Sequence, residues 1–533
     1  MRPLTLRRII LTALVVGLGV LLASGLSLTK YSPEISDSYV FGAFHVHSTL
    51  SDGLAPLEDI AREAKEARVG FVMLSDHGAP HPEAATLKRT IDGVRFIGGS
   101  EVGIPEGHLI VSDVRELPPY TLPPFPPDAV SDVAAWGGIS VVTYPEDPVY
   151  QWSYWETDLA PDGIEIVNVT SYFRRSSLPQ KLSWAIFSVF NRNYYVSGFE
   201  APTRALARWD ELLKHGRVHG FYAANAHGGF PLTEERTIGI PSYRTAMGYV
   251  GLAVEPRYRE APEDAIRRGE FFSLVRAAGE PNRFEFRESA GALVVRLDAA
   301  TTGARIDLKR NGDVVSSTRD GELRLEGPEA GVYRVEVYLE NHPLLADDVP
   351  WILSNPLFAG PSDSPVKPVK PVKPVKKDPL ACGGVDSVAL AELGLEMDDE
   401  SEATFEHEAS GALRLSYRLS QKTPEKIDRW VALSLRKPMN LSSYRGIEIR
   451  GGSPESMRYW IEVRSGDDGH YASVLFPTSG AVAIPWERFY PTLGPKRAIP
   501  LAAIDALFVT VNTSSSRTGF ASELTLESLG FCR

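Results

Sequence analysis

The first half of the chain alternates short apolar runs with segments whose apolar positions recur at helical spacing. Such alternation, with no other class of element, predicts a parallel α/β fold over residues 31–280. The runs that predict buried strands are Phe41–His47, Gly70–Ser75, Val94–Ile97, Gly107–Val111, Gly138–Thr143, Gly163–Val167 and Val218–Ala224. The segments that predict helices are Pro56–Arg68, Ala129–Trp136 and Arg204–Lys214.

One segment, Tyr172–Phe199, follows neither pattern and predicts an irregular aromatic insertion. Its aromatic side chains would suit an apolar lid, a membrane-facing patch or ordinary packing against the rest of the fold, and the sequence leaves these three open. The aromatic residues concerned are Tyr172, Phe173, Trp184, Phe187 and Phe190.

Beyond residue 280 the pattern changes to period two. Apolar and polar positions alternate over residues 281–345, and Asn311-Gly312 is a strong hairpin turn, so a small β-sandwich of immunoglobulin-like size is expected over 281–360. Its tail, Trp351–Phe358, is expected to pack back on the neighbouring domain. Residues 361–379 contain four Pro-Val-Lys repeats, which predict a stiff polyproline II linker. Residues 380–533 are again rich in predicted strands and form a further domain.

The amino terminus has the pattern of a targeting segment. Arg2, Arg7 and Arg8 precede an apolar run over Ile9–Leu26. A basic flank before an apolar run is typical of a secretory signal peptide or an N-terminal membrane anchor, and residues 1–30 fit both. In either case the rest of the chain would be extracytoplasmic, in the periplasm or at the cell surface. In the anchor case it would also be held to an inner membrane.

Cysteine usage agrees with export. The chain has two cysteines, Cys382 and Cys532, at the two ends of the last domain. In an exported protein this placement predicts a disulfide that joins the first and last strands of that domain. Two unrelated free thiols remain the alternative.

Composition narrows the classes of function. A chain of 533 residues should hold about two to four domains. The formal net charge of −12 argues against a general nucleic-acid-binding surface, although it allows a small phosphorylated substrate held by metal ions.

Candidate chemistry gathers where the predicted strands end. His45 and His47 are two residues apart on one strand and should face the same side, and Asp52-Gly53 forms a turn just after them. Histidines satisfied within a buried strand are the plain alternative, but they would not sort to one end of a sheet, which in α/β barrels is the catalytic rim. The polar residues at predicted strand ends are His45, His47, Asp76, His77, Glu101, Tyr144, Asn225 and His227, whereas His108 lies inside a strand.

These side chains form a donor set of nitrogen and oxygen without sulfur. A set of this kind suits Zn, Mn or Fe, and its size suits two or three divalent ions rather than one. Sites with several ions generate hydroxide near neutral pH and hold both oxygens of a displacement, which points to hydrolysis of an ester, phosphoester or amide. The candidate metal ligands are His45, His47, Asp52, His77, Glu101, His108, Asn225 and His227.

The order of these motifs resembles the polymerase and histidinol phosphatase (PHP) superfamily, and most of all its metallohydrolase branch that includes carbaryl hydrolase. The resemblance covers residues 38–280, and the tail Pro350–Pro356 also resembles that branch. The C-terminal domain is similar, on less specific grounds, to galactose-binding-like jelly rolls. The motifs that carry the resemblance are His45-Val-His47, Ser51-Asp52-Gly53, Ser75-Asp76-His77, Gly99-Ser-Glu101, Gly107-His108 and Asn225-Ala-His227-Gly.

The resemblance implies a distorted (β/α)7 barrel with a trinuclear site, followed by an Ig-like β-sandwich and a C-terminal β jelly roll. It assigns His45, His47, Glu101 and position 225 to a first ion. It assigns Asp52, His77 and His227 to a second ion. A third ion would share Glu101 with His108 and position 144. Asp76 would orient His77, and Asp52, Asp76 and Tyr144 are the residues expected to take part in catalysis.

Two positions depart from the family. Position 225, usually Asp, is Asn225, and position 144, usually His, is Tyr144. A tyrosine binds a cation well only as a phenolate, whose ordinary pKa is near 10. The departures therefore put the third ion in doubt and weaken the first, unless Glu146 or Asp147 substitutes.

Two functions follow from this sequence. The first is an exported metal-dependent hydrolase in which metal-bound hydroxide attacks a phosphoester or a carboxyl or carbamoyl ester of a small molecule. The second is a catalytically degenerate barrel in an envelope carbohydrate-binding or scaffold protein. In the second case the C-terminal domain would hold an envelope glycan. The aromatic side chains there that would stack on sugars, or else fill the core, are Tyr459, Trp460, Trp486 and Tyr490.

Overall fold

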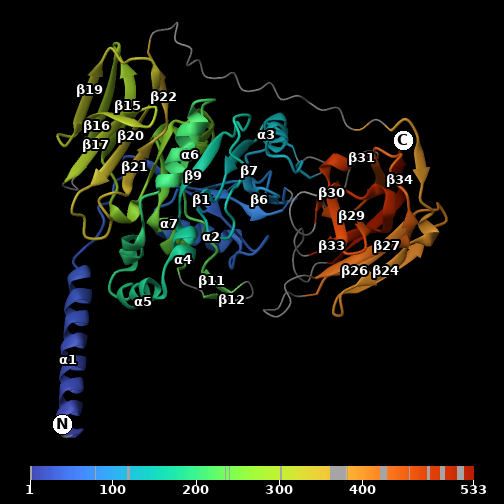
Figure 1. The fold of residues 1–533 in the computed structure, drawn as a ribbon, viewed down its shortest axis with the longest axis horizontal. Coiled ribbons are helices and arrows are strands. Elements are labelled where there is room, and N and C mark those ends of the chain that lie inside the picture. The colour runs from blue at the N-terminus through green and yellow to red at the C-terminus, as the bar shows by residue number, and fades with distance from the viewer. Residues whose placement is uncertain are drawn as a thin grey trace.

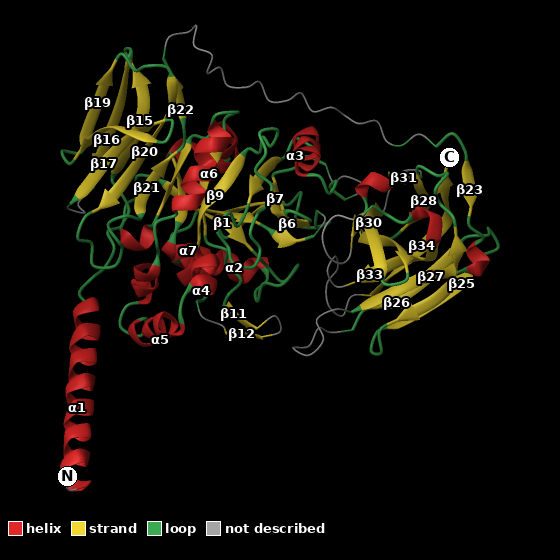
Figure 2. Cartoon of the chain, viewed as in Figure 1, coloured by secondary structure: helices red, strands yellow, loops and turns green. Residues whose placement is uncertain are grey.

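The structure is a computed structural model of the whole chain. It describes residues 3–78, 80–116, 121–233, 236–238, 241–299, 303–360, 380, 382–420, 429–454, 457–476, 481–491, 498–512 and 521–533. Strands dominate this part of the chain, so the protein is a mostly β, multidomain molecule (Figure 2). The predicted Pro-Val-Lys linker, residues 361–379, lies outside the described residues.

Two sheets enclose a common core in the first 280 residues, to which Phe44 and Phe71 of one sheet and Val141 and Phe221 of the other belong (Figure 1). The strands of the first sheet are β1 (Val40–Val46), β2 (Phe71–Leu74), β4 (Lys88–Ile91), β5 (Val94–Ile97), β13 (Gly251–Val254) and β14 (Phe271–Leu274). The strands of the second are β3 (Asp76–His77), β6 (Gly99–Ile104), β7 (Gly107–Ser112), β8 (Ile139–Val142), β9 (Gly163–Asn168) and β10 (His219–Ala223). The short strands β11 (Phe230–Thr233) and β12 (Arg236–Ile238) pair only with each other among the described residues.

The two sheets are joined on both sides by main-chain hydrogen bonds. On one side, His47 N donates to Ala226 O at 2.9 Å, and Ala226 N donates to His45 O at 3.0 Å. On the other side, Glu101 N donates to Ser75 O at 3.1 Å. The strands therefore close round the core, with β1 between the ends of β10 and β2.

The expected parallel arrangement is only partly correct. Strands β1, β2 and β5 run parallel, as do β8, β9 and β10, but β7 is antiparallel to both β6 and β8. The reason is local, because the two-residue turn Pro105-Glu106 joins β6 directly to β7, and parallel neighbours need a long crossover instead. Strands β13 and β14 also pair antiparallel beside β1. A regular (β/α)7 barrel is therefore not confirmed, and the enclosed β core is called the barrel below.

Helices cover the outside of this barrel. They are α2 (Leu57–Glu66), α3 (Pro126–Ala135), α4 (Val169–Arg175), α5 (Leu178–Phe187), α6 (Thr203–Leu213), α7 (Tyr243–Tyr249) and α8 (Pro262–Arg268), with 3-10 turns η1 (Arg192–Gly198), η2 (Pro256–Tyr258) and η3 (Arg276–Ala278). The predicted helices α2, α3 and α6 are present. The segment expected to be irregular is helical instead, because Asn168 caps α4 and Ser177 caps α5 by accepting main-chain N–H groups.

A β-sandwich follows the barrel and shares its first sheet. Strand β21 pairs with β14 of the barrel and with β20 of the sandwich, so the expected return of the 351–358 tail is confirmed. An immunoglobulin-like topology is not confirmed. The sandwich strands are β15 (Arg283–Ser289), β16 (Ala292–Asp298), β17 (Ala304–Arg310), β18 (Asp313–Thr318), β19 (Glu322–Glu326), β20 (Gly331–Leu339), β21 (Pro350–Ser354) and β22 (Leu357–Ala359).

The C-terminal domain is a second sandwich of two six-stranded sheets with its own core. One sheet contains β23 (Val385–Ser387), β25 (Glu402–His407), β26 (Leu413–Arg418), β28 (Gly446–Gly452), β31 (Val482–Pro485) and β34 (Ala521–Cys532). The other contains β24 (Gly394–Met397), β27 (Trp430–Met439), β29 (Met457–Ser465), β30 (Asp468–Phe476), β32 (Tyr490–Pro491) and β33 (Ile504–Asn512). Short 3-10 turns are η4 (Leu390–Glu392), η5 (Trp486–Arg488) and η6 (Leu501–Ala503). The predicted disulfide between Cys382 and Cys532 is confirmed.

The amino terminus forms α1 (Pro3–Leu28), which projects away from the body (Figure 1). Within the described part of the chain, no helix combines the length and the apolar character that crossing a membrane requires. The expected signal peptide or anchor stays a prediction.

Candidate metal centre

Strand β1 brings the first two histidines to the rim. A register shift between Phe44 and Val46 places His45 at a bulge, with a left-handed backbone of φ 66°. The His45 and His47 rings still face one side, and their centroids are 5.1 Å apart. Tyr144 (φ 55°) and Asn225 (φ 43°) at the same rim are also left-handed. Non-glycine residues adopt this conformation at a cost, and such residues cluster at functional sites.

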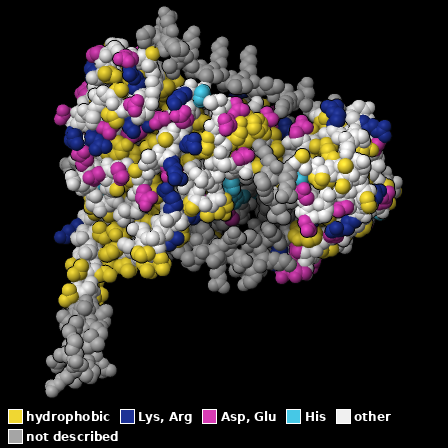
Figure 3. Space-filling view, viewed as in Figure 1, with side chains coloured by type: hydrophobic (Ala, Val, Ile, Leu, Met, Phe, Trp, Pro, Cys, Tyr) yellow, Lys and Arg dark blue, Asp and Glu magenta, His cyan; other side chains and the backbone are white. Residues whose placement is uncertain are grey.

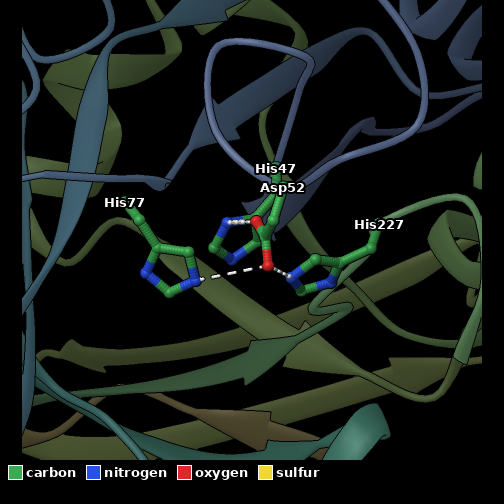
Figure 4. A group of neighbouring side chains, drawn as sticks. All are labelled: His47, Asp52, His77 and His227. Carbon is green, nitrogen blue, oxygen red and sulfur yellow. Dashed lines mark ion pairs between the residues drawn. The ribbon is translucent and has the colours of Figure 1, made fainter. Parts of the chain in front are cut away.

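Three histidines from different parts of the rim converge around the Asp52 carboxylate (Figure 4). His47 Nδ1 lies 3.2 Å from Asp52 Oδ1. His227 Nε2 and His77 Nε2 lie 3.3 and 3.5 Å from Asp52 Oδ2. Two ligands bound at about 2.1 Å to one tetrahedral ion are about 3.4 Å apart, so the spacing matches that of a single metal-ligand shell.

A second group lies deeper and shares His47. His45 Nε2 is 3.1 Å and His47 Nε2 is 3.3 Å from Glu101 Oε2. The other Glu101 oxygen, Oε1, lies 2.6 Å from His108 Nδ1. Glu101 therefore stands between three histidines, as expected of a bridging carboxylate. One detail differs from expectation, since His47 belongs to both groups rather than to the first alone.

Two buried polar side chains at the rim leave atoms that a bound ion could satisfy. Among the described residues, neither ring nitrogen of His47 has a hydrogen-bond partner, and neither has the side-chain oxygen of Asn225. His47 is fully buried and Asn225 nearly so. A buried polar atom without a partner costs about 1–3 kcal/mol unless a ligand satisfies it. The residues present therefore fit a metal ion.

The Asn225 amide is fixed beside this centre by two hydrogen bonds of its nitrogen. Its Nδ2 donates to Tyr144 Oη at 3.1 Å and to Asn168 Oδ1 at 3.2 Å. Because both amide hydrogens are used, the side-chain oxygen is the atom of the Asn225 amide that lacks a partner among the described residues. Tyr144 Oη also lies 3.4 Å from His45 Nε2. A ligand role for Asn225 stays a prediction.

Glu165 is a site residue that the sequence reasoning missed. It is fully buried at the centre of β9, and its Oε1 accepts from His45 Nδ1 at 2.5 Å. Its Oε2 accepts from Asn168 Nδ2 at 2.9 Å and from Tyr144 N at 3.2 Å. A carboxylate on the far nitrogen of a histidine fixes the ring and raises its basicity as a ligand. The available signal was one charged residue inside the apolar run Gly163–Val167.

Asp76 holds the loop that carries Asp52. Its carboxylate accepts from Ser48 N at 2.8 Å, Ser48 Oγ at 2.9 Å and Ser51 Oγ at 2.7 Å. These three bonds fix the turn that follows β1 and place Asp52 over the histidines. The expected orientation of His77 by Asp76 stays a prediction, and the hydrogen bonds of Asp76 hold the Ser48–Asp52 turn instead.

The two acidic residues considered as substitute ligands are used elsewhere. Glu146 Oε2 pairs with Arg175 at 2.8 Å, and Glu146 Oε1 accepts from Ala205 N at 2.7 Å. Asp147 pairs with Arg174 at 3.0 Å and accepts from Ser171 Oγ at 2.6 Å. Both carboxylates brace α4 and the start of α6 rather than the metal centre.

Charge coupling is strong within the centre. Burial would lower the pKa of His77, but Asp52 and Glu101 outweigh it and raise that pKa to about 10. Burial likewise opposes Glu165 and Glu101 at His45, whose pKa rises to about 9. The carboxyl pKa of Glu101 is held well below its ordinary value because the surrounding histidines outweigh burial. The carboxylates are therefore ionised and able to bind cations.

Tyr144 is poorly suited to be an anionic ligand in this setting. Burial first, and then the carboxylates of Glu101 and Glu165, raise the pKa of its phenol well above the ordinary value. The side chain therefore keeps its proton. The doubt about a third ion bound by Glu101, His108 and Tyr144 consequently remains.

The centre opens to solvent on one side. The side chains of Asp52 and His77 are 49% and 39% exposed, whereas those of His47 and Glu101 are fully buried. Figure 3 shows histidine side chains at the bottom of a hollow between the barrel and the C-terminal domain. A substrate can therefore reach the exposed edge of the centre.

The C-terminal domain docks beside this opening. Arg458 on β29 donates through Nε to Pro80 O, three residues after His77. Arg488 donates to Asp132 Oδ2 at 2.7 Å and Thr121 O at 3.2 Å, and Tyr490 Oη donates to Leu122 O. These contacts place one sheet of the C-terminal domain against the loops at the mouth of the barrel.

Comparisons with known proteins find only distant structural similarity to this chain. No protein-family model and no curated protein matches the chain. One similar solved structure is a two-domain protein from Bacteroides vulgatus ATCC 8482 that contains a predicted PHP-like metal-dependent phosphoesterase. It is 15% identical, with a TM-score of 0.28, and the alignment covers 61% of this chain and 98% of that one. These matches do not support the carbaryl-hydrolase branch in particular.

Other similar structures align with about a quarter of the chain. The family 11 carbohydrate-binding module of the cellulase Lic26A-Cel5E of Clostridium thermocellum is 13% identical, with a TM-score of 0.23, over 28% of this chain and 94% of that one. TmCBM61 in complex with β-1,4-galactotriose is 12% identical, with a TM-score of 0.16, over 27% and 90%. Because these TM-scores are too low to support an argument, the function has to be inferred from the chain's own geometry.

Proposed function

We propose that the protein is a metal-dependent hydrolase whose site is the rim formed by His45, His47, Asp52, His77, Glu101, His108, Asn225 and His227. The observation that carries this proposal is the pair of His47 ring nitrogens, which are fully buried, lack hydrogen-bond partners among the described residues, and lie 3.2 and 3.3 Å from two carboxylates. Divalent ions of the Zn, Mn or Fe type would supply Lewis acidity and an activated water there.

The residues of the chain have separable tasks. Asp52, His77 and His227 would hold one ion, with His47 and Glu101 between it and a second ion on His45 and Asn225. Glu165 orients His45, and Asp76 positions the turn that carries Asp52. Tyr144 keeps its proton and acts as a hydrogen-bond donor at the site rather than as a ligand, because burial and two carboxylates oppose its ionisation.

A cation near the mouth favours a phosphoester over a neutral ester. The Arg174 guanidinium lies 4.6 Å from the centre of the Tyr150 ring and 5.7 Å from that of Tyr144. The Tyr150 ring in turn lies 5.1 Å from the His108 ring. Arg174 shares its charge with Asp147 but keeps the planar donors that suit a phosphoryl group.

The test is turnover by the full chain loaded with Mn, Zn or Fe. A phosphodiester and a phosphomonoester of p-nitrophenol are compared with p-nitrophenyl acetate, before and after chelation. We expect metal-dependent release from a phosphoester that is lost on chelation. Turnover of the acetate alone would point to the carboxyl-ester alternative, and no chelator-sensitive turnover of any of the three would contradict the hydrolase.

A row of aromatic side chains supports a second function, glycan binding by the C-terminal domain. Trp460 shares with Arg458 the face of β29 that points away from the core of this domain, toward the barrel. It donates to Asn512 at 3.1 Å and stands edge-on to Tyr471 with centroids 5.3 Å apart. Trp430 lies opposite Asn512 in the strand pairing. Of the four aromatic residues expected to contact sugar, only Trp460 is partly exposed, because Tyr459, Trp486 and Tyr490 are buried.

Glycan binding is tested separately from turnover. Purified peptidoglycan and a panel of soluble polysaccharides are titrated against the full chain and its Trp460→Ala variant. We expect binding that weakens about tenfold or more in the variant, since stacking on one aromatic ring contributes a few kcal/mol at most. If the chain binds a glycan and shows no metal-dependent turnover, the degenerate-barrel alternative replaces the hydrolase.

A further inference from the structure

Helix α5 carries its apolar side chains on the outside. Leu178, Leu182 and Ile186 recur every four residues, and Val189 continues the same line just after the helix. Their exposed fractions are 69%, 55%, 40% and 82%. A surface helix normally turns such a stripe toward the core and its polar face toward water. These four residues are called the α5 stripe below.

The orientation of α5 is fixed by packing on its other side. Trp184 is buried and lies 4.3 Å, between ring centres, from Tyr195 of η1. Trp184 also stacks on Phe173 of α4 at 6.4 Å, and Ser177 caps the helix by accepting from Gln180 N. The helix therefore cannot rotate its stripe inward without losing these contacts. The stripe therefore stays on the outer surface of the protein.

The end of α1 lies against the same region. Asn191 Nδ2 donates to Leu28 O at 2.9 Å and to Tyr31 O at 3.1 Å, and the Phe190 ring packs on Gly25. Leu22 and Leu26 of α1 are 44% and 59% exposed. Figure 3 shows apolar side chains gathered where α1 meets the body. The α5 stripe and the exposed side of α1 thus form one apolar pole.

This pole is also the cationic part of an acidic protein. The net charge of the chain is −12, yet residues 1–33 and 166–199 contain no aspartate or glutamate. Lys30 and Arg192 are exposed beside the stripe, and the Lys181 ammonium lies over the Phe173 ring at 4.6 Å. An apolar stripe with a basic border is the pattern of a helix that lies in the headgroup region of an anionic membrane.

We propose that the α5 stripe seats the body of the protein on the surface of an anionic lipid bilayer. The helix lies in the plane of the interface, with Leu178, Leu182, Ile186 and Val189 among the acyl chains and the flanking cations at the headgroups. A second copy of the chain is less suited to cover the stripe. A symmetric contact would bring the positively charged Lys181 and Arg192 of both copies together, and these charges would repel each other. The proposal does not depend on hydrolase activity.

The first experiment measures the depth of the stripe in the full chain. Both native cysteines form the disulfide, so Ile186→Cys provides a single thiol for the environment-sensitive label NBD. Val314→Cys is the matched control, because Val314 is 53% exposed on β18 of the sandwich, away from this pole. The labelled proteins are mixed with vesicles of phosphatidylcholine with and without phosphatidylglycerol.

With anionic vesicles we expect a blue shift of the label at position 186 and at least about fivefold weaker quenching by iodide, with no change at position 314. Equal iodide access at the two positions, or no uptake of the protein by the vesicles, would overturn the proposal. A blue shift that grows with protein concentration and needs no vesicles would also overturn it, because it would mean that a second copy covers the stripe.

A second variant tests whether the stripe itself causes the seating. Leu182→Glu combined with Ile186→Glu places two acids in the stripe without touching the buried side of α5. A label at Leu178→Cys should lose its blue shift and regain full iodide access in this variant, while the unfolding temperature stays that of the parent. A label that remains protected would show that α1 alone holds the protein at the bilayer and would overturn the role of α5.

Discussion

Strand β10 has a histidine near each end, and the two ends differ sharply. At its start, His219 is buried against Phe271 and Gly269, and no hydrogen-bond partner reaches its Nδ1 among the described residues. After its end, His227 lies 3.3 Å from Asp52 and its ring stacks on that of His47 at 4.0 Å. Both side chains are shielded, but only one has a carboxylate beside it.

The difference concerns the charge beside the buried histidines. Burial, and then the nearby Arg217, lower the pKa of His219 to about 3, so that ring is neutral and serves packing alone. At the other end of the barrel, burial and His47 still lower the pKa of His227 itself despite Asp52. For its neighbours His45 and His77 the carboxylates outweigh burial and raise the pKa values to about 9 and 10. Negative charge that attracts protons also attracts metal ions. The carboxylates, rather than the histidines, therefore distinguish the two ends.

The largest expected effect separates the two histidine environments directly. His47→Ala removes a ring that belongs to both ligand groups, so turnover should fall by about a thousandfold or more. His219→Leu removes a histidine of similar burial and should keep metal content and turnover. Steady-state rates with the substrate found for the parent measure both variants. Equal losses in the two variants would mean that general stability, not ligation, explains the effect.

The second effect is on stability in acid. The pKa of His219 is lowered on folding, so the unfolded chain binds more protons below about pH 6.5 and stability must fall as the pH falls toward 3. Between pH 7 and pH 4 this one group should cost roughly 3 kcal/mol. Urea unfolding of the parent and of His219→Leu over that range measures it. Parallel pH profiles would show that His219 is not the responsible group.

A smaller effect should come from the carboxylate behind His45. Glu165→Gln keeps the shape of the side chain but removes its charge, so His45 becomes a weaker ligand. We expect metal affinity to fall about 10–100-fold, with the fold retained. Competition with a chelating dye measures the affinity. An unchanged affinity would mean that His45 does not ligate a metal ion.

The smallest effect concerns the turn that carries Asp52. Ser51→Ala removes one of the hydrogen bonds to Asp76, and Ser48 still supplies two. We expect a loss of metal affinity of about tenfold or less, because the net contribution of one hydrogen bond is about 0.5–1.5 kcal/mol and the two bonds from Ser48 still hold the turn. Thr49→Ala is the control within the same turn. A larger loss than in Glu165→Gln would mean that the position of Asp52 matters more for metal binding than the orientation of His45.

Much of the rim could be predicted because strand ends are readable in the sequence. His45, His47, His77 and His227 lie at or just after apolar runs. The structure groups His47 with His77 and His227, and groups it separately with His45. Glu165 could not be found this way, because it is one polar residue inside a strand and its partner His45 is 120 residues away. Long-range pairing of that kind is not encoded in local periodicity.

The errors in the fold have similar causes. The predicted direction of β7 was wrong because strand-helix alternation outweighed the two-residue turn Pro105-Glu106. Helix α5 was expected to be irregular because its apolar stripe and its buried Trp184 lie on different faces, which obscures a single amphipathic pattern. The cap at Ser177 was the available signal for that helix.

The most direct test of the central claim is the metal content of the purified protein, measured by inductively coupled plasma mass spectrometry without chelator in the buffers. The account predicts about two equivalents of Zn, Mn or Fe per chain in the parent and in His219→Leu, and a clear loss in His47→Ala. Less than about a third of an equivalent in the parent, or an equal content in all three proteins, would contradict the claim that this rim is a metal centre.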